Sequence, residues 1–414
     1  MMPMMMDEEA LRAIPSADLL AAWGETVEAF LDPGSPERRA LDPELARTSR
    51  LSPEGLAAAL EAVLGGVRTG PAAALLAEAE GMPSGGGPVL AVLASNLPAL
   101  AVQPLWPALA LRRPILIKSP SAEPVFVPAF LAALTRREPR LEKGVAAATW
   151  RGGDERVEAP ILEQVATVIA YGDEPALADL ERRAPGKVVG YGPKTSLAVV
   201  AEGEHGRPRT DTGSHGRFLE SEMSVPDRAC PSAASGLARD IALFDQRGCL
   251  SVAAVYVSGN AEELAVRLEE ELAELARRWP PGPADPAALA AVQQARLEAE
   301  MRGLRRTGLP ILSGTVLVDP NPTFRPSPGL RTVRVHPMAG LDRLPEILSP
   351  WRGKLQGAAL AGEGALLLVP ALAGLGISRH AAPGDLQSPD VTWHNGGVHP
   401  LHALSVQQTQ GSSR

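Results

Sequence analysis

Cysteine, lysine and aromatic residues are scarce in this chain of 414 residues. Two cysteines, Cys230 and Cys249, are too few for a disulfide-rich secreted scaffold and favour a reduced compartment. Basic residues are not in excess either, because 40 Lys and Arg stand against 48 Asp and Glu. The resulting net charge of −8 argues against nucleic-acid binding and against a polybasic membrane anchor. The first nine residues carry neither the basic nor the apolar segment of a signal peptide, so we expect a cytoplasmic protein.

The sequence has no uninterrupted apolar run long enough to suggest a membrane span. The apolar stretch 88–111 is broken by Ser95, Asn96, Gln103 and three prolines, which would be costly in lipid. The 40 glycines and 40 prolines follow no fixed period, which excludes a collagen-like chain. With 45% apolar and 21% charged residues, the composition is typical of a globular protein of roughly two to three domains.

The order of the expected elements points to an α/β fold. In the helical first eighty residues, Ser16 and Ser52 are candidate N-caps, and Leu56, Leu60 and Leu64 share one face. After these, apolar segments alternate with helical ones, which predicts βαβ units and a mostly parallel sheet. The predicted strands are 89–94, 115–117, 145–149, 165–170, 187–189, 196–200, 251–257, 315–318 and 332–335. The predicted helices are 99–111, 125–135, 175–183, 232–244 and the segments after Asn260 and Asp285. We expect two α/β lobes with a cleft between them.

One cysteine lies in a setting that suits chemistry. Cys249 follows a glycine in a turn between a helix and a buried strand. Such a turn can hold a thiol at a cleft with backbone N–H groups near it, and the thiolate is the reactive form. The sequence equally permits an inert buried cysteine.

Two further polar residues follow predicted strands. Asn96 comes after strand 89–94, where its amide could donate to an oxyanion or simply form a turn. Lys118 ends strand 115–117 and is one of only five lysines. It could contact a phosphate or ribose, or be a solvated loop residue. Carboxyl ends of parallel strands face the ligand side of such sheets.

Two other patterns fail as motifs. In the stretch 190–195, Pro193 replaces the glycine that precedes the lysine of a P-loop. Thr195 replaces the third glycine of a dinucleotide fingerprint, and a strand rather than a helix follows. His394, His399 and His402 match no zinc-site spacing, so no metal site is predicted.

These motifs occur in the order found in the aldehyde dehydrogenase superfamily: strand–Asn–x–Pro, strand–Lys–x–x, a glycine-rich stretch and then the cysteine. The chain resembles more closely the LuxC-type acyl-CoA reductases of bacterial luminescence. Its segment Phe-Asp-Gln-Arg-Gly-Cys-Leu-Ser, at 244–251, is similar to the nucleophile segment of that family. The segments 375–379, 384–389 and 393–396 are similar to its C-terminal signature. The resemblance extends from about residue 88 to residue 404.

The resemblance implies an aldehyde dehydrogenase-like α/β fold with a small oligomerisation element. The implied parts are an N-terminal helical segment (1–80), a dinucleotide-binding domain (81–228, with a loop at 202–228), a catalytic domain (229–385) and a C-terminal segment (386–414). That last segment returns to the cofactor domain or to an oligomer interface.

The resemblance also assigns roles to single residues. Cys249 matches the nucleophile, and Asn96 matches the oxyanion donor, together with the backbone N–H of Cys249. Lys118 matches the contact to the cofactor ribose or phosphate. Ser121, Gly190 and Gly192 are the other implied cofactor-binding residues.

Two departures from aldehyde dehydrogenases are informative. Gly190 stands where those enzymes carry a general-base glutamate, so hydrolysis of a thioacyl enzyme should be slow. Ser121 stands where they often place the glutamate that holds the ribose hydroxyls. The missing carboxylate leaves room for a 2′-phosphate, which favours NADPH, with NADH as the alternative.

The resemblance therefore implies NADPH-dependent reduction of a fatty acyl-CoA, or of an acyl-protein thioester, to the aldehyde through S-acyl-Cys249. A homo-oligomer and a partner protein that transfers the acyl group are the implied partners. Three alternatives stay open: oxidation of a free aldehyde with NAD(P), cofactor-independent acyl transfer by the cysteine, and an inactive scaffold.

Overall fold

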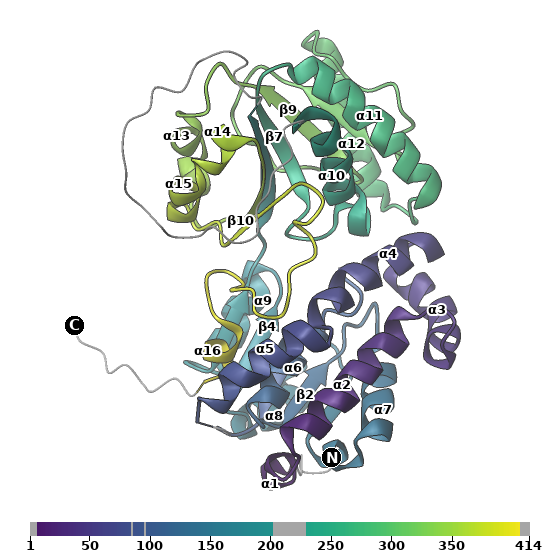
Figure 1. The fold of residues 1–414 in the computed structure, drawn as a ribbon, viewed down its shortest axis with the longest axis vertical. Helices are drawn as coiled ribbons and strands as arrows, with labels where there is room; N and C mark the ends of the chain where they lie inside the picture. The colour runs from purple at the N-terminus through teal and green to yellow at the C-terminus, as the bar shows by residue number, and fades with distance from the viewer. Residues whose placement is uncertain (1–5, 84–85, 95–96, 202–228, 406–414) are drawn as a thin grey trace, which may run out of the picture.

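The computed structural model describes residues 6–83, 86–94, 97–201 and 229–405. They form two lobes, each a parallel sheet with helices on both faces (Figure 1). The predicted α/β fold of two lobes is confirmed. Within the described residues, no helix combines the length and the apolar character needed to cross a membrane.

Among the described residues, five α-helices precede the first strand: α1 (Glu8–Arg12), α2 (Ser16–Leu31), α3 (Pro36–Ser49), α4 (Pro53–Leu64) and α5 (Thr69–Glu80). Ser52 caps α4 as predicted, because its Oγ accepts the N–H of Gly55 at 3.0 Å. The cap prediction for Ser16 is wrong. Pro15 holds the extended N-cap position, and Ser16 is already the first helical residue.

The first sheet has the order β3-β2-β1-β4-β5, with every neighbouring pair parallel. Alternate residues face opposite ways, as the two-residue period of a strand requires. Val89 and Ile115 pack with α2 to α7, whereas Leu90 and Leu116 pack with α8 and α9. The strands are β1 (Val89–Val92), β2 (Ile115–Lys118), β3 (Val145–Ala148), β4 (Thr167–Tyr171) and β5 (Val188–Tyr191). The helices between them are α6 (Val102–Ala110), α7 (Phe126–Arg137), α8 (Glu155–Gln164) and α9 (Glu174–Arg183).

The second sheet has the order β11-β10-β6-β7-β9-β8 and is also parallel throughout. Helices α10 and α11 cover one face and α13 to α15 the other (Figure 1). Helix α12 packs on Leu317 of β8, which faces away from α10 and α11. Its strands are β6 (Thr195–Ala201), β7 (Val252–Ser258), β8 (Thr315–Val318), β9 (Thr332–Pro337), β10 (Leu355–Ala361) and β11 (Arg379–Ala381). Its helices are α10 (Ala229–Ala242), α11 (Ala261–Arg278), α12 (Pro286–Met301), α13 (Leu344–Leu348), α14 (Glu363–Leu366) and α15 (Val369–Gly374).

The change from the first sheet to the second differs from the expected boundary at 228. Strand β5 belongs to the first sheet and β6 to the second, so the chain crosses over between Tyr191 and Thr195. Pro193 lies at the crossing, where a residue without an N–H cannot continue a ladder. The expected loop 202–228 lies outside the described residues.

The C-terminal segment runs back onto the first lobe. Val391 N–H donates to the carbonyl of Gly66 at 2.9 Å, and Arg113 donates to the carbonyl of Leu404. Helix α16 (Pro400–Leu404) lies beside α6 (Figure 1). The segment thereby connects the two lobes a second time, after the crossing at 192–194.

Candidate active site

A cavity of about 640 Å³ lies between the lobes. Its lining comes from the carboxyl ends of β1, β4 and β5, from the turn before β7, and from the segment 387–398. Small-molecule sites typically enclose roughly 300–1,000 Å³, so the volume suits a cofactor and a substrate group. The cavity lies at the predicted cleft.

The turn that leads to Cys249 is strained. Phe244, Asp245 and Gln246 have φ values of 58°, 50° and 62°, in the left-handed region. Non-glycine residues seldom adopt this conformation, and each instance costs about 1–3 kcal/mol. Three in a row persist only if the surroundings hold them.

Buried polar contacts hold this turn. The carboxylate of Asp245 accepts a hydrogen bond from the buried guanidinium of Arg331, with Oδ1 and Nη2 2.7 Å apart. Gln246 Nε2 donates to the carbonyls of Val252 (2.7 Å) and Thr332 (2.8 Å). Gln246 Oε1 accepts the N–H of Thr332 at 2.7 Å. The side chains of Asp245 and Gln246 thus hold the turn against β7 and β9.

Cys249 follows the turn and lines the cavity. Burial raises the pKa of its thiol to about 11. Hydrogen bonds from the backbone N–H groups of Cys249 and Leu250, and the charge of Lys194, act in the opposite direction. Ser196 Oγ donates to the carbonyl oxygen of Cys249 at 2.8 Å, which holds the peptide group between Cys249 and Leu250. Backbone donors beside Sγ are what an oxyanion formed by attack on a carbonyl needs.

The other residues assigned by resemblance are not all brought to this cavity. Asn96 lies outside the described residues, although its neighbours Ala94 and Leu97 line the cavity. Lys118 ends β2 at the same edge of the first sheet but does not line the cavity. Ser121 is exposed, in the segment that follows β2.

Lys118 has surroundings that the sequence did not suggest. It is buried, with its ammonium 5.7 Å from the ring centre of Trp150. Burial lowers the pKa of Lys118, and the nearby carboxylate of Glu158 partly offsets this. The next residue, Ser119, has a buried Oγ with no hydrogen-bond partner among the described residues. A cation and an unpaired hydroxyl at a strand end suit the phosphate or ribose of a dinucleotide.

Gly190 and Gly192 line the cavity at the end of β5. A Cβ on Gly190 would stand 3.3 Å from the methyl groups of Leu177, on α9. Leu177 therefore fills the space into which a side chain at position 190 would project. Among the described lining residues, the one carboxylate is Asp173, which is exposed.

Sequence reasoning missed several lining residues. Lys194 is one, and its Nζ lies 3.5 Å from where a Cβ on Gly396 would stand. Tyr171 and Tyr191 also line the cavity, stacked with ring centres 4.9 Å apart. Their positions at the carboxyl ends of β4 and β5 are the signal that could have identified them.

The C-terminal signature supplies another part of the lining. Ser251 lies two residues after Cys249, and its Oγ donates a hydrogen bond to the side-chain oxygen of Gln387 at 3.0 Å. The three histidines lie elsewhere: His399 contacts the other two rings and pairs with Glu78 at 2.9 Å. Within the described ranges, no group of three or more His, Cys, Asp or Glu is placed to hold a metal ion.

Comparisons with solved structures agree with this architecture. Aldehyde dehydrogenase 21 from Physcomitrella patens, solved with the product succinate, superimposes with a TM-score of 0.69 at 14% identity. The match covers 95% of this chain and 83% of that one. The NADP-dependent glyceraldehyde-3-phosphate dehydrogenase from Bacillus halodurans, solved with NADP, has a TM-score of 0.66 at 14% identity, covering 91% and 80%. These likenesses establish an aldehyde dehydrogenase-like fold.

Sequence comparisons extend the assignment to a family. The long-chain acyl-protein thioester reductase of Photorhabdus laumondii is 24% identical over 192 residues. That match covers 45% of this chain but only 35% of the relative's length. The sequence profile of the family described as acyl-CoA reductase (LuxC) matches residues 78–407, most of the chain. The protein therefore belongs to the LuxC family of acyl-CoA reductases.

Proposed function

We propose that this protein reduces a fatty acyl thioester to the aldehyde through an S-acyl intermediate on Cys249. One observation carries the proposal. The cavity between the lobes holds the thiol of Cys249 beside two backbone donors, and Leu177 fills the space beside Gly190, the residue that by resemblance replaces a hydrolytic base. Family membership and the thioester reductase named among the relatives support the same reaction.

The residues suggest the order of events. The Cys249 thiolate attacks the thioester carbonyl, and the backbone N–H groups of Cys249 and Leu250 stabilise the oxyanion. The donor thiol leaves and takes up the proton that Cys249 gave up. A reduced nicotinamide, when bound, would supply the hydride that converts the S-acyl group to an aldehyde. When the aldehyde leaves, Cys249 is again a thiolate, held by the same N–H groups.

Water must not intercept the acyl enzyme before reduction. A general base aligned with the thioacyl carbon would accelerate hydrolysis, often by about 10²–10⁴-fold. Gly190 offers no such group, and Leu177 covers the position with apolar atoms. This arrangement favours reduction over hydrolysis.

The cofactor and partners are part of the proposal. Lys118 and the exposed Ser121 at the end of β2 would hold a cofactor ribose or phosphate, with Gly190 and Gly192 beside the cofactor. The serine leaves room for a 2′-phosphate, so we infer NADPH rather than NADH. The acyl donor is coenzyme A or a carrier protein. We further infer a cytoplasmic homo-oligomer.

The reaction direction can be tested by paired assays. We expect aldehyde formation from a long-chain acyl-CoA with NADPH, and at most a slow reverse oxidation of free aldehyde with NAD(P). Efficient aldehyde oxidation to the free acid would instead favour the dehydrogenase. Acyl transfer without nicotinamide would favour an acyltransferase, and no reaction of Cys249 would favour a scaffold.

Asn96 is the proposed side-chain donor to the oxyanion. Loss of one such donor typically lowers kcat by about 10²–10³-fold. We expect Asn96→Ala to slow aldehyde formation by that factor while the melting temperature changes little. Turnover within about twofold of wild type in a folded Asn96→Ala protein would remove this residue from the mechanism.

A further inference from the structure

The N-terminal helices contact the turn that carries Cys249. Arg247, two residues before the thiol, donates from Nη1 to the carbonyl of Ser49 at 2.8 Å. Its Nη2 donates to the carbonyl of Arg50 at 3.4 Å, and its Nε to that of Phe244 at 3.0 Å. One guanidinium thus joins the turn to the end of α3.

The end of a helix is a favourable place for this cation. The last carbonyls of α3 have no partner within the helix and carry the negative end of its dipole. Arg50, the C-cap residue, has a left-handed backbone (φ 56°), the conformation in which many helices end. Arg247 satisfies carbonyls that a helix end leaves open.

Two more contacts reinforce this junction. Gly282 lies against Arg50, since a Cβ on Gly282 would stand 2.0 Å from the Arg50 carbonyl oxygen. The N–H of Gly282 donates to Asp245 Oδ2 at 3.0 Å. Phe244 is buried in the same apolar cluster as the N-terminal helices. The turn is therefore enclosed between α3–α4 and the second lobe.

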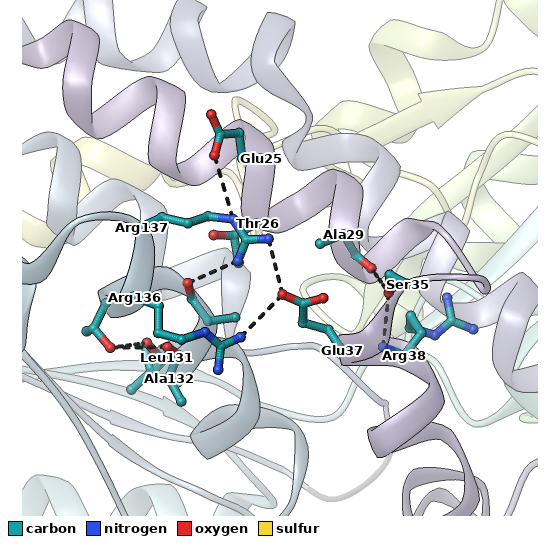
Figure 2. A network of polar contacts seen from close by, with 12 residues as sticks. Glu25, Thr26, Ala29, Ser35, Glu37, Arg38, Leu131, Ala132, Arg136 and Arg137 are labelled. Atoms are coloured by element: carbon teal, nitrogen blue, oxygen red, sulfur yellow. Dashed lines mark hydrogen bonds and ion pairs between the residues drawn. The ribbon is translucent and has the colours of Figure 1, made fainter.

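Helix α3 is itself fixed to the first lobe. Glu37, in its first turn, pairs with Arg136 (3.3 Å) and Arg137 (3.2 Å) at the end of α7, as Figure 2 shows. At the start of the helix, Ser35 Oγ accepts the N–H of Arg38 at 3.1 Å (Figure 2). Because α3 is fixed to α7 of the first lobe, the bonds of Arg247 to the end of α3 also fix the Cys249 turn relative to that lobe.

We propose that Arg247 is a positioning residue through which the N-terminal helices fix the backbone of the Cys249 turn. Most of these helices precede residues 78–407, the region that the family model matches. The proposed role therefore gives residues outside that region a part in shaping the site. The inference rests on the proposed function only in taking Cys249 as the nucleophile.

The mechanism of this effect is geometric. The N–H groups of Cys249 and Leu250 stabilise a thiolate only while the peptides point at Sγ. The three left-handed residues before them store strain that a loosened turn would release. Without Arg247, the turn can relax, and the N–H groups of Cys249 and Leu250 would then no longer point at Sγ.

The test compares Arg247→Met with Arg247→Lys and with a control on the same helix. Arg47→Met is the control, because Arg47 is exposed on α3 and pairs only with Glu44 among the described residues. The readouts are the rate of iodoacetamide alkylation at Cys249, followed by peptide mass from pH 7 to pH 10, and the melting temperature. Alkylation needs neither thioester nor nicotinamide, so it separates this inference from the proposed reaction.

We expect Arg247→Met to lower the alkylation rate at pH 8 about tenfold, the effect of raising the thiol pKa by one unit. Arg247→Lys keeps the charge but lacks the several N–H donors of the guanidinium, so its alkylation rate should lie between that of Arg247→Met and that of wild type. Arg47→Met should match wild type. If Arg247→Met does not fold, Arg247→Lys decides. Folded Arg247 variants with a wild-type rate and pH profile would overturn the proposal.

Discussion

At the scale of single residues, the reactivity of Cys249 depends on two opposing influences. Burial raises the pKa of the thiol to about 11, so little thiolate exists at pH 7. Below that pKa, each rise of one pH unit increases the thiolate about tenfold. The backbone donors and Lys194 limit the penalty of burial. Reaction at Cys249 should therefore accelerate steadily from pH 7 to pH 9.

Removal of the Lys194 charge should slow every reaction of the thiol. In Lys194→Met the thiolate loses the contribution of this charge but keeps the backbone donors, so we expect the rates of alkylation and acylation at pH 7 to fall several-fold and the pH–rate profile to move to higher pH. Stopped-flow measurement of acyl-enzyme formation checks this. Lys143→Met, at an exposed site on the first lobe, is the control and should behave as wild type. An unchanged profile in Lys194→Met would contradict the assigned role.

The position of Gly190 supports a second substitution. Gly190→Glu should not create an aldehyde dehydrogenase, because its Cβ would stand 3.3 Å from Leu177, which must move. We expect a lower melting temperature and no gain in thioester hydrolysis. The double variant Gly190→Glu, Leu177→Ala provides room and should discharge the acyl enzyme to free acid faster. Hydrolysis in the single variant equal to that in the double variant would show that Leu177 does not exclude the base.

At the scale of elements, local sequence predicted some parts and could not predict others. β1, β2 and β7 were predictable because their apolar runs are long enough to mark buried strands. β10 was missed because Leu355–Ala361 is mostly alanine, glycine and leucine, although every residue is buried. Helix α8 was missed because Pro160 lies within it. Strand β6 was predicted, but its sheet is set by pairing with β7 and β10, which its own residues do not reveal.

The same limit applies to the candidate site. The motif around Cys249 identified the thiol because the motif is contiguous. Lys194 lines the cavity through the crossing before β6, and Leu177 packs from α9 against Gly190; no local pattern encodes either contact. Lys118 was placed at the correct strand end, yet its burial beside Trp150 is a tertiary effect.

The turn before β7 should be the most sensitive element to loss of a buried charge partner. Asp245→Ala leaves the guanidinium of Arg331, which is 2% exposed, without its carboxylate. Breaking a buried pair in this way typically costs about 3–5 kcal/mol. We expect that loss in the free energy of unfolding, measured in urea. Glu44→Ala removes an exposed pair, so its free energy of unfolding should stay close to that of wild type. An equal loss of unfolding free energy in the two variants would show that the Asp245–Arg331 pair does not hold the turn.

At the scale of the whole molecule, the cavity is a product of chain topology. The first lobe supplies strand ends, the second supplies the turn that carries Cys249, and the C-terminal segment completes the lining after crossing back. The lobes are joined near the site by the 192–194 crossing, the Arg247 junction and the segment 387–398. Under the proposed function, a thiol held between the lobes in this way would meet a thioester and a dinucleotide in one cavity.

The most direct test is the intact mass of the protein after mixing with a long-chain acyl-CoA, with and without NADPH, for wild type and Cys249→Ala. We expect wild type to gain the mass of the acyl group, to lose it when NADPH is added, and to release the aldehyde. Cys249→Ala should gain nothing. An adduct that persists with NADPH, or that forms equally on Cys249→Ala, would contradict reduction through S-acyl-Cys249.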